Sequence, residues 1–142
     1  MKRTLARALT VALAAALAGC SSSGRLGEMR SYPQPQDVVW QAANQAMVDL
    51  GAAIVSTSPA MGVVVGRLQL VEAGMPITVE ASVRGSSRDP SAAQTSGADV
   101  RVSAFPPRDT APDEDLTAAL QGLEERYLEL LDAAVARMLQ MS

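Results

Sequence analysis

Apolar residues recur at helical spacing in two segments of the chain. In the first, about residues 36–50, they return every three or four positions and share one side of the helix that they predict. These residues are Val39, Trp40, Ala43, Ala46, Met47 and Leu50. Gly51 follows as a natural helix stop. Because Trp40 lies on this apolar stripe, we expect it to pack in the core rather than to bind a ligand.

The second helical segment runs from about residue 113 to residue 140. Its apolar stripe is Leu116, Leu120, Leu123, Tyr127, Leu130, Ala134 and Met138, with Glu125, Glu129 and Asp132 predicted on the opposite side. Three adjacent acids, Asp113, Glu114 and Asp115, stand at its start and could hold calcium or perform acid–base chemistry. No EF-hand spacing follows them, whereas an N-cap with carboxylates in the first turn stabilises a helix. The pattern favours capping.

Between the two helices, the period changes from helical to the alternation of strands. Four strands are predicted, at 52–57, 63–71, 76–84 and 98–105. In the last two, apolar and polar residues alternate cleanly, which is typical of an antiparallel sheet with one buried face and one wet face. If Val83 pairs with Val100, then Arg84 faces Asp99 and Ser82 faces Arg101. Exposed cross-strand pairing accounts for these charges better than a binding site does.

The strand at 63–71 also predicts a candidate partner surface. If Leu68 and Leu70 face the helices, then Val63 and Val65 point outward with Arg67 and Gln69. Scattered surface valines need no explanation, because much of any protein surface is apolar. The functional alternative is that Val63 and Val65 mark a face or edge covered by a partner chain or a second copy. Loop 85–97, rich in Ser, Gly and Ala, is long for a hairpin and is expected to be either disordered or functional.

The N-terminus has the pattern of a secretory signal. Lys2, Arg3 and Arg7 precede an apolar run from Leu9 to Leu17, which is too short to span a bilayer. Leu17, Ala18, Gly19 and Cys20 then resemble the lipobox of bacterial lipoproteins at every position. This resemblance implies cleavage before Cys20 and a diacylglyceryl thioether on its sulfur. Since residue 21 is Ser and not the inner-membrane retention signal Asp, it also implies a place on the periplasmic side of the outer membrane rather than at the inner membrane.

Composition then excludes several chemistries. Cys20 is the only cysteine, so no disulfide is possible within the chain, and histidine is absent. The sole lysine, Lys2, leaves with the signal, so residues 20–142 lack a lysine or histidine catalyst and any histidine or free-cysteine metal ligand. These residues keep nine of the 12 basic and all 15 acidic side chains, a net charge of −6. These absences narrow catalysis to carboxylate chemistry, such as that of a hydrolase with two acids converging in a cleft. We expect no enzyme activity, no metal, no cofactor and no nucleic-acid partner.

Residues 1–19 are thus expected to be a signal peptide, 20–30 a lipidated tether, and 31–142 a single α+β domain with a four-stranded antiparallel sheet and two helices on one face. Certain residues weakly resemble the start of the helix-grip domains of BamC-like outer-membrane lipoproteins. These are Tyr32, Pro35, Val39, Trp40, Ala43, Leu50, Gly51, Ile54 and Gly62. The resemblance covers about residues 30–62 and implies an envelope role beside another membrane component.

Two function classes follow. The first is a non-catalytic scaffold or accessory factor, anchored through Cys20, with an envelope protein as partner. The second is a small-molecule or lipid-binding lipoprotein, since helix-on-sheet folds can open a cavity between their layers. A cavity lined by Val79, Val102 and Leu130 would favour the binder, and a filled core would favour the scaffold.

Overall fold

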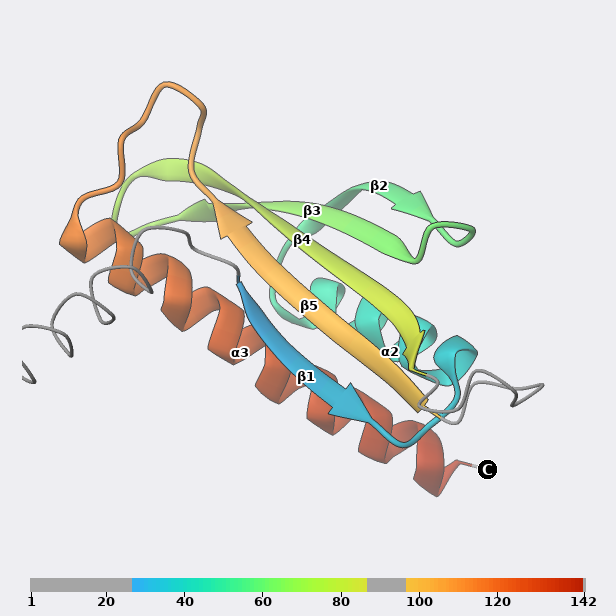
Figure 1. The fold of residues 1–142 in the computed structure, drawn as a ribbon. Coiled ribbons are helices and arrows are strands. Elements are labelled where there is room, and N and C mark those ends of the chain that lie inside the picture. Colours follow the sequence, from blue (N-terminus) through green and yellow to red (C-terminus); the bar gives the residue numbers. More distant parts are fainter. Residues whose placement is uncertain (1–26, 87–96, 142) are drawn as a thin grey trace, which may run out of the picture.

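The structure, a computed structural model, describes residues 27–86 and 97–141 and has an α+β fold. Its elements, in order, are β1 (Glu28–Tyr32), α2 (Gln36–Asp49), β2 (Ala53–Ser58), β3 (Val63–Leu70), β4 (Met75–Ser86), β5 (Gly97–Phe105) and α3 (Glu114–Gln140). All four strand pairs are antiparallel, and the strand order is β1-β5-β4-β3-β2. Both helices cover the same face of this sheet (Figure 1). We call the other face, away from the helices, the open face.

The sheet has five strands, not the four that the sequence predicts. The additional strand, β1, pairs with β5 from Glu28–Val102 to Tyr32–Ala98. It begins inside the range expected to be tether, so residues 28–30 belong to the folded domain. The sequence shows no alternation of apolar and polar residues in β1, because two of its positions on the helix side of the sheet, Glu28 and Arg30, are charged. Charged side chains are possible there because β1 is at the edge of the sheet.

The other elements agree closely with the predicted ones. The β4–β5 hairpin has the predicted register, with Val83 opposite Val100 and Arg84 opposite Asp99. Gly51 ends the turn after α2 with a φ of 93°, a conformation that glycine adopts without strain. The predicted signal peptide, lipobox and Cys20 lie outside the described residues, as does most of loop 85–97.

The core lies between the open sheet and the two helices. On the sheet, Val79, Val83, Val100 and Val102 are almost wholly buried. On α2 the matching face is mainly alanine, at positions 42, 43 and 46, which lets the helix approach the sheet closely. Trp40 is partly buried against this core, as predicted. The small side chains of α2 leave room for larger ones from α3, among them Tyr127 and Leu131.

The buried side of α3 differs from the predicted stripe at several positions. Leu123, Leu130 and Met138 are only partly buried, whereas Leu131 and Glu124 are almost completely buried. Asp132 was expected to face away from the domain but contacts β1 instead. The reason is that α3 packs on α2, on β5 and on β1 together, so its contact arc is wider than a single seam.

Candidate functional site

Val63 and Val65 lie on the open face, as the alternation predicted. Val64, between them, points toward the helices and has an exposed fraction of 0%, whereas the two flanking valines are partly exposed. Their cross-strand neighbours are small or polar: Ser82 and Glu80 on β4, and two serines of β2. We call Val63 and Val65 the valine patch.

The rest of the open face is mostly polar, with charges of both signs. Arg84 lies opposite Asp99, and Ser31 of β1 donates a 2.7 Å hydrogen bond to the Asp99 carboxylate. These contacts favour the structural interpretation of the strand charges that the sequence suggested. Two further apolar side chains are exposed, Met29 on β1 and Phe105 at the end of β5. The valine patch therefore differs from the rest of the open face, because it places two apolar side chains of one strand next to each other on that face.

Beside the valine patch, β2 forms an exposed edge of the sheet. It pairs with β3 on one side, and the sheet has no strand beyond it in the described part of the chain. Five of its six residues are exposed and Ser58 is partly exposed. Ile54 is 38% exposed and Val55, at a bulge in the strand, is 55% exposed. In the turn that follows, Met61 is 73% exposed.

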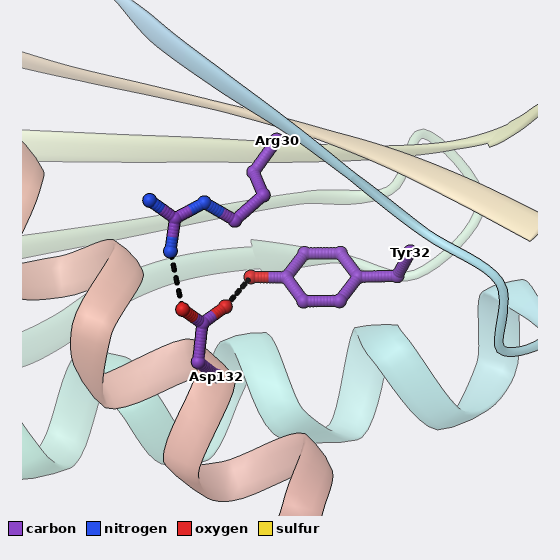
Figure 2. Close-up of polar contacts among 3 residues, drawn as sticks. All are labelled: Arg30, Tyr32 and Asp132. Atoms are coloured by element: carbon purple, nitrogen blue, oxygen red, sulfur yellow. Dashed lines mark hydrogen bonds and ion pairs between the residues drawn. The ribbon is translucent and has the colours of Figure 1, made fainter.

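The opposite edge, β1, is fastened to α3. The Asp132 carboxylate accepts a 2.7 Å hydrogen bond from the Tyr32 hydroxyl through one oxygen and forms an ion pair with Arg30 through the other. Figure 2 shows both side chains of β1 converging on this carboxylate. We call Arg30, Tyr32 and Asp132 the β1 latch. The two ends of the sheet are therefore unlike: one edge is charged and held by a helix, and the other is uncharged and open.

Both tyrosines of the chain are structural. Burial, followed by the hydrogen bond to the Asp132 carboxylate, raises the pKa of Tyr32 above its usual value. Burial also raises the pKa of Tyr127, whose hydroxyl donates a 2.8 Å bond to the carbonyl of Ala43 and joins α3 to α2. Each hydroxyl is thus held protonated and acts as a donor, not as a nucleophile.

One buried acid was missed by the sequence analysis. Glu124 is 1% exposed, and its carboxylate accepts a 3.0 Å bond from the backbone N–H of Ala104 in β5. Ala104 lies two residues beyond Val102, the last residue of β5 that pairs with β1. Glu124 follows Leu120 by four positions, so helical spacing alone could have placed it in the apolar arc. The Glu124 carboxylate therefore accepts the hydrogen bond of a β5 backbone N–H that lies beyond the last described pair between β5 and β1.

The acids at the start of α3 occupy its N-cap and first turn. Asp113 is the N-cap, and its side chain accepts a 2.7 Å hydrogen bond from the Leu116 N–H, as the capping prediction requires. Glu114 and Asp115 occupy the first turn. Within residues 27–86 and 97–141, no group of three or more acids, histidines or cysteines is arranged to hold a metal ion.

The three residues proposed to line a cavity lie in or against the core. Val79 and Val102 are fully buried, and Leu130 is partly buried. Four hollows on the described residues have other linings, such as the one at the end of the open face beside Arg67, Phe105 and Arg108. These hollows are on the surface, and none of the four lies between Val79 and Leu130. In the part of the chain that is described, no helix is long and apolar enough to cross a membrane.

No family model matches the chain, and no curated protein matches it at a significant level. Among solved structures, the crystal structure of Ara h 8.0201 is similar with a TM-score of 0.39 and 14% sequence identity. The alignment covers 78% of this chain and 95% of that chain. A likeness at this level carries no argument about function.

Proposed function

We propose that this protein is a lipid-anchored, non-catalytic scaffold or accessory factor of the bacterial envelope, which binds a protein partner on the open face at the valine patch. The proposal rests on the difference in charge and exposure between the two ends of the sheet. The β1 edge is held by Asp132, whereas the valine patch and β2 at the other end are apolar or uncharged, five of the six β2 residues are exposed, and no described strand lies beyond β2.

The interior offers little support for a ligand-binding alternative. The side chains between sheet and helices form one buried hydrophobic cluster, which includes Val79 and Val102, and none of the four hollows described above is lined by either valine. A binder of small molecules or lipids would need a pocket of roughly 300 Å³ or more between the layers. The side chains of residues 20–142 also favour a non-catalytic role, because they include no histidine and no lysine.

The proposed anchor and the proposed binding surface belong to different strands of the sheet. The tether from Cys20 enters the domain at β1, and β3, which carries the valine patch, is the third strand from β1 (Figure 1). Three strand spacings amount to about 14 Å. The centre of the proposed binding surface is therefore displaced along the sheet from the point where the tether enters.

Photo-crosslinking in native membranes tests the binding surface. Amine-reactive reagents are unsuitable because the only lysine is Lys2, so a photoreactive side chain is placed at Gln69, on the same face of β3. We expect a discrete adduct in the lipidated chain. Changing Val63 and Val65 to Thr should remove that adduct while lowering the free energy of unfolding by less than about 1 kcal/mol, since both side chains are partly exposed.

Val64→Thr is the matched control. Val64 is fully buried, so a hydroxyl there should cost about 1–3 kcal/mol, and the adduct should persist in the molecules that remain folded. An adduct that survives in the Val63→Thr/Val65→Thr protein would contradict the proposed surface. A small, non-protein adduct would favour the ligand-binding alternative.

The anchor is tested separately. Cys20→Ser should block lipid attachment and cleavage of the signal, because the thiol sulfur is the proposed attachment atom. Mass spectrometry would detect both effects, and fractionation of the unchanged protein should find it in the outer membrane. Normal processing in the Cys20→Ser variant would refute the lipoprotein assignment.

A further inference from the structure

The β2 strand lacks most of the features that keep the edges of sheets from pairing with other chains. Its sequence, Ala-Ile-Val-Ser-Thr-Ser, has no charge and no proline. An exposed edge strand presents unpaired N–H and C=O groups, and natural proteins protect such edges with charges, proline, bulges or a covering element. The one protective feature of β2 is the bulge between Ile54 and Ser56, which leaves Ser56–Ser58 in regular pairing with β3.

The two edge strands, β1 and β2, differ in how well their side chains suit pairing with a strand of another chain. On β1, Glu28 and Arg30 are charged, and Arg30 is paired with Asp132 of α3. On β2, β-branched and hydroxyl side chains predominate, a composition that favours strand pairing. Two copies of residues 20–142, each of net charge −6, repel one another in general, but two copies of β2 bring no like charges together.

We propose that β2 pairs antiparallel with β2 of a second copy of this chain, so that the two sheets become one continuous sheet. The pairing rests on the anchored state in the proposed function, because six residues form a small interface. Confinement of two copies to one membrane raises their effective concentration and can compensate for a small contact.

The geometry suits two copies anchored in one membrane. Two antiparallel strands of the same sheet are related by a two-fold axis perpendicular to the sheet. If that axis lies along the membrane normal, both β1 strands are at the outer edges and at the same height, so both tethers reach the same leaflet. The pairing also joins the two open faces, with the valine patches one strand away from the seam on each side.

Disulfide trapping in the full-length chain tests this pairing. Cys20 is the only native cysteine and is consumed by lipid in the proposed function, so a single introduced cysteine can crosslink only to its own copy in a partner. Val55→Cys, Ser56→Cys and Thr57→Cys are made one at a time, and Ser31→Cys on β1 is the control, since Ser31 and Ser56 are both exposed. In directly opposed residues of paired strands, Cα atoms are near enough for a disulfide.

We expect one of the three β2 positions to convert most of the protein in the oxidising periplasm to a disulfide-linked dimer, while Ser31→Cys stays monomeric. If the cysteine at position 56 or 57 gives the highest dimer yield, adding Val55→Lys to that variant should abolish the dimer and adding Val55→Thr should preserve it. If Val55→Cys gives the highest yield, Ser56→Lys and Ser56→Thr are added to it instead, with the same two expected results. Dimer yields at β2 no higher than that of Ser31→Cys would overturn the pairing.

The outcomes separate this inference from the proposed function. A disulfide-linked dimer of the parent chain, which has no introduced cysteine, would show that Cys20 is a free thiol and would refute the anchor. A photoreactive side chain at Val55 gives a second measurement. An adduct with twice the mass of the chain supports the pairing, and an adduct with another protein overturns it while leaving the proposed binding surface intact.

Discussion

Removal of the Asp132 carboxylate should destabilise the domain by detaching β1 from α3. In Asp132→Ala, the Tyr32 hydroxyl loses its 2.7 Å acceptor and Arg30 loses its ion pair. A hydrogen bond to a charged group contributes about 1.5–3 kcal/mol. The Arg30 contact adds less than about 1 kcal/mol, because the side chains of Arg30 and Asp132 are 41% and 48% exposed.

We therefore expect Asp132→Ala to lower the free energy of unfolding by about 1.5–3 kcal/mol in total, since the partly exposed hydrogen bond lies toward the low end of its range. For a domain of this size, that corresponds to a fall in Tm of roughly 5–15 °C. Trp40 is the only tryptophan and is partly buried, so its fluorescence reports urea or thermal unfolding of the whole domain.

Three further variants divide this effect between the two contacts. Tyr32→Phe should cost about 1.5–2 kcal/mol, the low end of the range for a hydrogen bond to a charged group, and Arg30→Gln less than about 1 kcal/mol. Asp132→Asn keeps an oxygen acceptor for Tyr32 but removes the charge. The double variant Tyr32→Phe/Asp132→Ala should cost less than the sum of its single changes, because they remove the same bond. Strict additivity, or a change below about 0.5 kcal/mol in Asp132→Ala, would refute this account of the β1 latch.

Three other changes can be checked by thermal or urea unfolding. Folding raises the pKa values of Tyr32 and Tyr127, so their contribution to the free energy of unfolding is fully present below pH 10 and is lost as the pH rises above 10. For fully buried Tyr127, the free energy of unfolding should fall by up to about 1.4 kcal/mol per pH unit. A free energy of unfolding that does not change from pH 9 to 11 would contradict this. Gly66→Ala should cost about 1–3 kcal/mol, since the new Cβ would lie 2.7 Å from Met47 Sδ, whereas Gly122→Ala, with no atom within 4 Å, should stabilise α3 by up to about 1 kcal/mol. Equal effects at the two glycines would refute the packing argument. Asp113→Ala should cost about 1 kcal/mol through loss of the α3 cap, and Asp113→Ser should restore most of it.

Local pattern by itself determined most of the elements. The helical stripes, the stop at Gly51 and the alternation of β4 and β5 depend on residues near one another in sequence, and they fixed the register of Val83 opposite Val100. The outward direction of Val63 and Val65 followed from the same period of two. The lipid anchor is likewise a prediction from local sequence alone, at Leu17–Cys20.

Tertiary structure alone decided the features that depend on distant partners. The strand β1 carries charges where a core strand would carry apolar residues, and it forms a strand because β5 is beside it and Asp132, a hundred residues away, accepts from Tyr32. Glu124 is buried because the N–H of Ala104 requires an acceptor there. The strand order also could not be predicted from the sequence. The alternation of apolar and polar residues shows which face of the sheet each side chain occupies, but not which strands are neighbours. That order makes β1 and β2 the two edges, since pairing is set by contacts between segments far apart in the chain.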